Sequence, residues 1–311
     1  MPHPVCIVKL IEEFKSRSPM RATSLISTVF GDVVTQHGGV IWMGSLVEAL
    51  ALLGLDERLV RTSISRLVKD GWLKSHKQGR KSFYQLTTYG LHEYQRAANR
   101  IYDLKKPQWN GNWQLVIPRN IPNDKKDPFR RSLYWQGFRA ISNGLLARPR
   151  SRNDDLMETI EEFGVEDNVL LLNGTAESLL PYQVIQDVVE ECWELGKVAE
   201  RYREFNKHYK PLGKWLRKSR PEPESAFVAR TLLMHDYRRI ILQDTSLPEK
   251  LLPTRWPGVE AQHLTSDIYL RLAPASIEYI TTNLQSDIGL LAGPKAPFKE
   301  RFNGNSPGKT A

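Results

Sequence analysis

The pattern of hydrophobic positions between residues 55 and 86 predicts a helix followed by a two-stranded hairpin. Asp56 is suited to cap the start of this helix, and Gly71 to end it in a left-handed conformation. Aromatic and alternating residues at 72–74 and 82–86 are typical of short strands, and Gly79 provides a turn between them. The apolar positions recur at three- and four-residue steps, which places them along one side of the helix; they are Leu55, Leu59, Val60, Ile64, Leu67 and Val68.

The opposite side of the predicted helix collects cations and hydroxyls, and more cations follow at the hairpin turn. Guanidinium and hydroxyl groups bond phosphate oxygens and base edges, and a helix fits the major groove. A basic helix can also be only a solvated face. We nevertheless predict DNA contacts, on the helix by Arg58, Arg61, Thr62, Ser65, Arg66 and Lys69, and at the turn by Gly79, Arg80 and Lys81.

The neighbouring segments favour the DNA-binding interpretation. Residues 24–35 and 43–53 show helical apolar spacing, and residues 37–42 separate them with a turn and a short strand. Helix, strand, helix, turn, helix and hairpin is the order of a winged helix-turn-helix. A trailing amphipathic helix at 91–104 either carries dimer contacts or packs on its own domain.

The rest of the chain predicts two further domains, so the expected fold class is α+β and multidomain. A central ferredoxin-like α/β domain is indicated by strands at 113–117, 140–146 and 168–172 that alternate with helices at 128–135 and 154–163. Helices at 183–205, 227–242 and 259–273 indicate a mostly helical C-terminal domain. The expected boundaries are an N-terminal arm at 1–20 with a helix at 5–15, a winged helix-turn-helix domain at 21–106, the central domain at 107–178, the helical domain at 179–288 and a disordered tail at 289–311.

Charge supports a polyanionic partner. The 311 residues carry a formal net charge of +9, and residues 56–81 hold eight Lys or Arg against three acids. Cys6 and Cys192 are far apart and lack metal-ligand spacing, which argues against a disulfide framework or a zinc site. No apolar run is long enough to cross a bilayer, so we expect a cytoplasmic protein without a membrane partner.

Enzymatic alternatives find little support. A ferredoxin-like domain could host a metal-dependent nuclease if Asp124, Asp127 and Asp154 converged on Mg²⁺. Two histidine–aspartate pairs, at 235–236 and 263–267, could bind a metal or serve acid–base chemistry, but solvated or structural histidines are the better interpretation. No catalytic serine motif, zinc-protease motif or phosphate-binding glycine loop accompanies them. We therefore expect no enzyme, no metal and no cofactor.

Seven stretches resemble the PaaX-type repressors of phenylacetic acid degradation, and they span nearly the whole chain. The last is long and of unusual composition, so chance explains it poorly. The stretches are SLISTVFGD (24–32), GGVIWMGSL (38–46), ERLVRTSISRLVKDGWL (57–73), GRKSFYQLT (79–87), WQGF (135–138), EECW (190–193) and HDYRRIILQDTSLPEKLLPTRWPG (235–258).

The resemblance implies a homodimeric repressor on the promoter of a phenylacetate catabolic operon, released by phenylacetyl-CoA. It supports the DNA contacts above other than Lys69, with Arg61 and Arg66 reading bases and the hairpin cations binding phosphates. A regulator of the same architecture that answers another acyl-CoA or a free aromatic acid stays open. A coenzyme A thioester needs cations and an apolar slot; the candidates are Arg238, Arg239, Tyr237, Trp193 and Trp256, which could equally be core and ion-pair residues.

Overall fold

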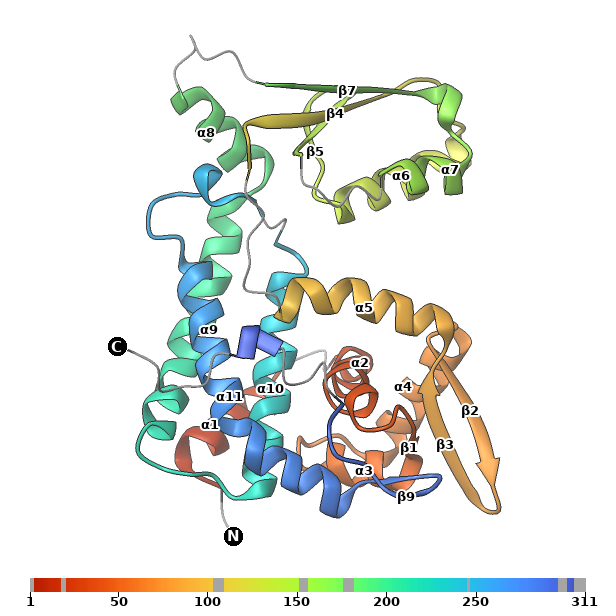
Figure 1. Ribbon diagram of the computed structural model, residues 1–311, viewed down its shortest axis with the longest axis vertical. Helices are drawn as coiled ribbons and strands as arrows, with labels where there is room; N and C mark the ends of the chain where they lie inside the picture. The colour runs from red at the N-terminus through yellow and green to blue at the C-terminus, as the bar shows by residue number, and fades with distance from the viewer. Residues whose placement is uncertain are drawn as a thin grey trace. The chain divides into compact units, whose positions relative to one another are not determined.

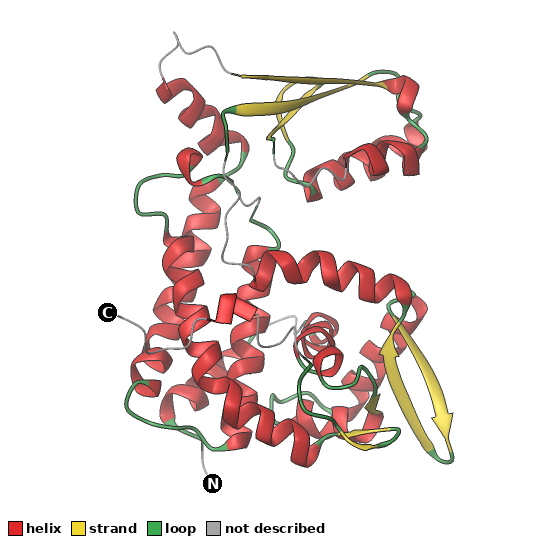
Figure 2. Ribbon diagram, viewed as in Figure 1, coloured by secondary structure: helices red, strands yellow, loops and turns green. Residues whose placement is uncertain are grey.

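The computed structural model shows an α+β protein of helices and small antiparallel sheets (Figures 1 and 2). It divides into two compact units. The first comprises residues 1–104, 202–240 and 257–311, and the second residues 105–201 and 241–256. The structure describes residues 3–17, 21–102, 109–150, 156–175, 182–244, 247–295 and 301–304.

The N-terminal part of the first unit follows the element order that the hydrophobic pattern predicts. Its three-stranded antiparallel sheet has the order β1-β3-β2. The elements are α1 (Val5–Lys15), α2 (Ala22–Asp32), the 3-10 turn η1 (Val34–Gln36), β1 (Ile41–Trp42), α3 (Met43–Ala51), α4 (Glu57–Lys69), β2 (Leu73–Gln78), β3 (Lys81–Leu86) and α5 (Thr88–Tyr102).

Local signals explain the bounds of α4 and of the hairpin that follows it. The carboxylate of Asp56 accepts the backbone N–H of Leu59 at 2.7 Å, which satisfies one of the free donors at the helix start. Gly71 ends the segment at φ +74°. Val60, Ile64 and Leu67 are buried as predicted, whereas Val68 is 37 % exposed because it lies at the edge of the apolar stripe.

The helices of the C-terminal half belong to the same compact unit as the N-terminal segment, which differs from the expected separate helical domain. They are α9 (Leu195–Leu216, from residue 202 onward), α10 (Pro223–Ile241) and α11 (Pro257–Asn283). Helix α10 is buried along most of its length, and its Arg230 bonds Asp32 of α2 at 2.8 Å. A buried pair between residues 198 positions apart leaves no trace in local periodicity.

Part of the C-terminal tail is folded, contrary to the disorder expected from its composition. At the start of the tail, β9 (Gly289–Leu290) pairs with β8 (Gln285–Ser286), which precedes the tail, and Leu291 is buried. The 3-10 turn η4 (Arg301–Gly304) buries Arg301 and Phe302. The burial of these two side chains orders the turn, although the surrounding sequence is rich in Gly and Pro. Residues 296–300 and 305–311 lie outside the described residues.

The second unit contains a strand-helix-strand-strand-helix-strand arrangement. Its antiparallel sheet has the order β5-β6-β4-β7, and α6 and α7 contribute Phe129, Leu133, Leu156 and Ile160 to its core. The elements are β4 (Asn112–Pro118), α6 (Asn123–Trp135), β5 (Arg139–Ser142), β6 (Leu145–Pro149), α7 (Leu156–Phe163), the turn η2 (Glu166–Asn168), β7 (Val169–Thr175), α8 (Tyr182–Cys192) and the turn η3 (Glu249–Leu251).

Two expected elements of this unit are each divided in the structure. The single strand predicted at 140–146 is the hairpin β5–β6, because Gly144 turns the chain at φ +77°. The single helix predicted at 183–205 is split into α8 and α9, with Glu194 in a left-handed conformation at φ +49°. The apolar periodicity of the sequence continues through the turn at Gly144 and through the helix break at Glu194, so it predicts neither of them.

A buried histidine in the first unit predicts a loss of stability in mild acid. Burial lowers the pKa of His235 from 6.5 to about 4; Asp236 opposes the shift, and Arg239, Arg17 and Arg238 add to it. The unfolded chain therefore takes up this proton first, and stability falls as pH drops from 6.5 toward 4. Between pH 7 and pH 5 we expect this histidine to cost about 2 kcal/mol of unfolding free energy.

Urea unfolding at pH 7 and pH 5 tests this expectation in the wild type and in His235→Gln. The variant keeps a hydrogen-bonding side chain near Thr28, whose hydroxyl lies 3.4 Å from the His235 ring. It should lose less stability between the two pH values than the wild type does. Equal losses in both proteins would show that His235 does not remain neutral in the folded state.

Candidate nucleic-acid interface

The structure brings the predicted contact residues of α4 together on one exposed face. Val60, Ser63, Ile64 and Leu67 face the core, so the other side of the helix is left to solvent. The six predicted residues Arg58, Arg61, Thr62, Ser65, Arg66 and Lys69 are all exposed, and five of them, from Arg61 onward, line one open depression together with Asp70.

Few interactions hold these side chains in place. Arg61 forms an exposed ion pair with Glu57 at 2.7 Å, and the Thr62 hydroxyl donates to the carbonyl of Arg58 at 2.8 Å. An exposed pair one helical turn apart is worth only about 0.3–0.5 kcal/mol. Among the described residues, Arg66 and Lys69 have no ion-pair partner. The face can therefore exchange its contacts for those of an anionic ligand at small cost.

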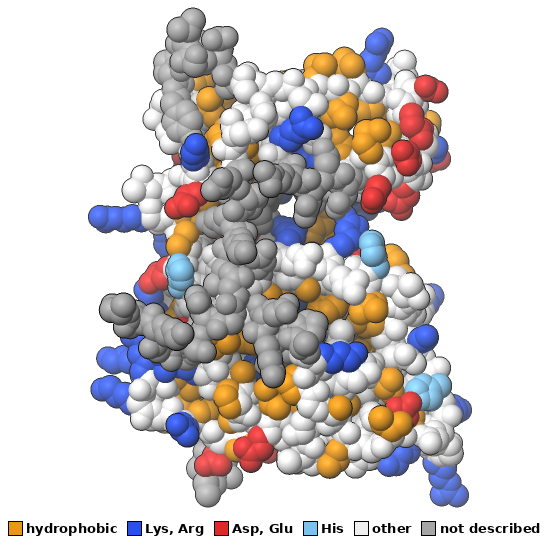
Figure 3. Space-filling view, viewed as in Figure 1, with side chains coloured by type: hydrophobic (Ala, Val, Ile, Leu, Met, Phe, Trp, Pro, Cys, Tyr) orange, Lys and Arg blue, Asp and Glu red, His pale blue; other side chains and the backbone are white. Residues whose placement is uncertain are grey.

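The β2–β3 hairpin presents a cationic tip. Gln78 pairs with Lys81, so Gly79 and Arg80 form a two-residue turn, and Gly79 takes φ +60° without strain. Both turn residues are exposed. Figure 3 shows Lys and Arg side chains at the end of this hairpin, at the lower right. Lys74 and Lys77 of β2 are exposed as well and extend the set that we predicted.

Lys81 differs from the other hairpin cations because its ammonium is held by side chains of other elements. It lies 4.3 Å from the centroid of the Trp42 ring and donates to the side-chain oxygen of Gln285 at 3.2 Å. These contacts direct it toward β1 and β8 rather than beyond the turn. Lys81 can bind a phosphate on the β1 side of the hairpin, whereas Arg80 is the cation of the turn itself.

The C-terminal hairpin β8–β9 contacts the middle of the β2–β3 hairpin, a role that the sequence did not indicate. The ring of His76 lies 3.1 Å from the carboxylate of Asp287 and stacks on Phe83. The backbone N–H of Gln285 donates to the Ser45 hydroxyl at 3.1 Å. Residues 76 and 287 are 211 positions apart, so only the fold reveals this contact.

The five effector candidates are divided between the two units. Tyr237, Arg238 and Arg239 belong to the first unit, and Trp193 and Trp256 to the second. Tyr237 is 1 % exposed, and the Arg238 guanidinium bonds the Ser24 carbonyl and the Thr28 hydroxyl, each at 3.3 Å. The indole of Trp193 is buried and donates to the Gly137 carbonyl at 3.2 Å.

The aspartates considered as magnesium ligands or as acid–base groups lie in helix turns or ion pairs where the structure describes them. Asp124 lies in the first turn of α6, and Asp127 pairs with Arg130 one turn away at 3.1 Å. Asp154 lies outside the described residues. Asp236 binds Arg17 in a two-pronged ion pair, and Asp267 binds Arg271 at 2.8 Å. Across the described parts of the chain, no three His, Cys, Asp or Glu side chains gather in a way that could hold a metal ion.

Three sequence profiles of one family match this chain in succession. They are described as PaaX-like protein at residues 21–90, PaaX protein central Cas2-like domain at residues 106–183 and PaaX-like protein C-terminal domain at residues 193–282. A relative from Escherichia coli (strain K12), the transcriptional repressor PaaX, is 38 % identical over 288 residues, which cover 92 % of this chain and 91 % of that protein. The chain belongs to the PaaX family.

A solved structure shares the overall fold of this PaaX family member. It is an uncharacterized protein from Mycobacterium tuberculosis, 20 % identical, with a TM-score of 0.50 over 80 % of this chain and 94 % of that one. At this identity the likeness concerns the fold alone. None of the helices that the structure describes combines the length and apolarity needed to span a bilayer.

Proposed function

We propose that this PaaX family member is a cytoplasmic DNA-binding transcriptional repressor of a phenylacetate catabolic operon. One observation carries the proposal: α4 presents an exposed face of cations and hydroxyls and is followed at once by a hairpin with an exposed cationic tip. The relative of 38 % identity, itself named a transcriptional repressor, supports it. Such a protein needs neither a catalytic group nor a cofactor.

The DNA-reading part of the proposal is a winged helix-turn-helix. Helices α2, α3 and α4 would form the helical core, α4 would enter the major groove, and β2–β3 would be the wing. Arg61 and Arg66 would contact base edges, and Thr62 and Ser65 would bond bases or phosphates. The phosphate contacts would come from Arg58, Lys69, Arg80 and Lys81, with Gly79 allowing close approach of the backbone.

The proposal includes a homodimer and a ferredoxin-like central domain. The connectivity of the second unit supports the latter, because two strand-helix-strand halves form one antiparallel sheet with its first and third strands adjacent. A two-fold dimer would recognise an inverted repeat whose half-sites lie whole helical turns apart.

Arg80→Ala is expected to weaken binding to all DNA sequences by about threefold to tenfold, because it removes a phosphate contact that carries no sequence information. The slope of log affinity against log salt should become shallower by about 0.9. Fluorescence anisotropy with operator and unrelated duplexes at several salt concentrations measures both quantities. The control is Lys126→Ala, which removes an exposed cation of α6. If Arg80→Ala had the same slope of log affinity against log salt as this control, Arg80 would not be a phosphate contact.

The proposed effector is phenylacetyl-CoA, and a mobility-shift titration of a phenylacetate-operon promoter fragment tests it. We expect the thioester to release the fragment, and free phenylacetate or coenzyme A alone to leave it bound. A tenfold loss of operator affinity requires about 1.4 kcal/mol of coupling between the two sites. Release by another acyl-CoA or by a free aromatic acid would reassign the effector. Absence of selective binding to the fragment would overturn the repressor proposal.

A further inference from the structure

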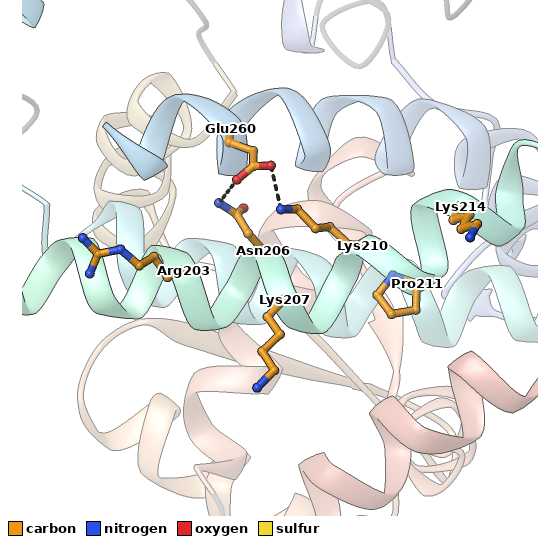
Figure 4. Close-up of a pocket in the computed structure, with 7 residues that line it drawn as sticks. All are labelled: Arg203, Asn206, Lys207, Lys210, Pro211, Lys214 and Glu260. Carbon is orange, nitrogen blue, oxygen red and sulfur yellow. Dashed lines mark hydrogen bonds and ion pairs between the residues drawn. The ribbon is translucent and has the colours of Figure 1, made fainter. Parts of the chain in front are cut away.

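A basic groove lies between α9 and α11 in the first unit (Figure 4). It measures about 600 Å³. Four cations follow one another along α9 at steps of four, three and four residues, so they share one face of the helix. At 1.5 Å per residue they span about 16 Å. The groove is lined by Arg203, Asn206, Lys207, Lys210, Pro211, Lys214 and Glu260.

The cations of the groove exceed its acids. Glu260 is the one acid among the lining residues, and it is already bound by the ammonium of Lys210 at 2.8 Å. Lys207 and Lys214 are exposed and have no ion-pair partner among the described residues. In Figure 4 both extend from α9 without a dashed contact. Two uncompensated ammonium groups on either side of a satisfied pair favour a ligand with more than one negative charge.

The groove also contains a buried hydrogen-bond acceptor with no donor. Asn206 is 2 % exposed, and its amide nitrogen donates to the Glu260 carboxylate at 3.0 Å and to the Pro257 carbonyl at 3.1 Å. These two bonds fix the orientation of the amide, so its oxygen is the acceptor that lacks a partner. Pro211 removes a further donor, because it has no N–H for the carbonyl of Lys207. An unsatisfied buried acceptor favours a ligand that brings an N–H group.

We propose that the α9–α11 groove binds the phosphates and an N–H group of a nucleotide-type ligand, as the coenzyme A part of a thioester would provide. Lys207 and Lys214 would bind phosphate oxygens, and the Asn206 oxygen would accept the N–H. The groove's affinity for such a ligand stands by itself; its identity as the effector site rests on the proposed function.

The groove is well separated from the proposed DNA-reading elements. In Figure 1, α9 lies at the left of the first unit and α4 with the β2–β3 hairpin at its right. Arg238 is engaged by Ser24 and Thr28, whereas the two free lysines of the groove are available to phosphate. An effector bound here would act on the fold through α9, α10 and α11, and not by competing with DNA for α4.

Isothermal titration calorimetry of the full chain without DNA tests the proposal. The ligands are coenzyme A, adenosine 3′,5′-bisphosphate, inorganic phosphate and unphosphorylated adenosine. We expect coenzyme A and the bisphosphate to bind more tightly than phosphate, and adenosine not to bind measurably. Lys207→Ala with Lys214→Ala should weaken coenzyme A binding by about tenfold or more, and added salt should weaken the wild type further.

The matched control is Lys9→Ala with Lys126→Ala, which removes two exposed lysines from α1 and α6. Thermal unfolding of each variant checks its fold, since neither groove lysine makes an ion pair whose loss would destabilise the chain. The proposal is overturned if the wild type binds neither coenzyme A nor the bisphosphate, or if the groove variant binds coenzyme A like the control. If the groove variant lost affinity for unrelated DNA but bound coenzyme A normally, the groove would be a DNA contact and the proposal would be wrong. Operator binding is measured in a separate experiment. Failure of the repressor proposal is therefore distinguishable from failure of the groove to bind coenzyme A.

Discussion

Replacing Arg61 and Arg66 together by alanine should reduce the preference for operator over unrelated DNA by roughly 2–6 kcal/mol, which is about thirtyfold or more. Each arginine lies on the exposed face of α4 and carries a forked donor group that can bind a base edge with two hydrogen bonds. Affinity for unrelated DNA should fall much less. Anisotropy titrations with operator and scrambled duplexes at one salt concentration measure both affinities.

A double variant of α6 provides the control for this experiment. Arg130→Ala with Arg131→Ala also removes two exposed guanidiniums, but from the second unit. It should leave the ratio of operator to scrambled affinity within about twofold of wild type. If the α4 variant lost affinity equally for both duplexes, Arg61 and Arg66 would be phosphate contacts, and sequence would be read elsewhere.

Asp32→Asn should destabilise the first unit by about 3–5 kcal/mol, because it removes the buried carboxylate charge to which the buried guanidiniums of Arg230 and Arg301 are paired. Asp32 is 3 % exposed, and its carboxylate accepts bonds from Arg230 at 2.9 Å, Arg301 at 2.6 Å, Tyr102 at 2.6 Å and Tyr269 at 2.9 Å. Burial opposes the charged form, but Arg230 and Arg301 overcome it and hold the pKa of Asp32 below its ordinary value. The carboxylate therefore stays ionised at neutral pH.

Urea unfolding at pH 7, followed by circular dichroism, measures this change. Asp127→Asn is the matched control, since it makes the same substitution in an exposed pair with Arg130 and should cost less than about 1 kcal/mol. A loss in Asp32→Asn no larger than in the control would mean that the buried cluster does not stabilise the fold.

The buried cluster around Asp32 joins segments that are far apart in the chain, and it therefore offers a route by which a bound ligand could act on the DNA-reading helices. Asp32 ends α2, Arg230 lies in α10, Tyr269 in α11 and Arg301 in the C-terminal turn η4. Helix α11 also forms one wall of the basic groove. A ligand that shifts α9 against α11 would thus act on the helices that hold α2 in place, and α2 packs against α4.

Helix α4, the β2–β3 turn and the exposed cationic face could be predicted because their causes are local. Asp56 caps the helix it precedes, Gly71 ends it, and Gly79 makes a turn that only two residues fill. Side chains three and four residues apart share a helix face in any fold. Such signals lie within one window of sequence, and the structure places these residues as the pattern predicts.

The partners of these elements could not be predicted, because they come from distant parts of the chain. Arg301 beside Asp32 lies in a tail whose composition is typical of disorder, and Asp287 beside His76 comes shortly before that tail. The α9 cations have helical spacing in the sequence, but the Glu260 and Asn206 contacts that shape the groove depend on how α11 packs on α9. Buried long-range pairs decide which helices share a unit, and periodicity does not report them.

Hydroxyl-radical footprinting of the wild type on a phenylacetate-operon promoter tests the central claim most directly. If α4 reads the major groove and the β2–β3 hairpin contacts the flanking backbone, protection should fall on an inverted repeat with half-sites whole helical turns apart. The Arg61→Ala and Arg66→Ala double variant should lose this protection at the same protein concentration. Uniform protection along the fragment, or a footprint that the double variant retains, would contradict sequence reading by α4.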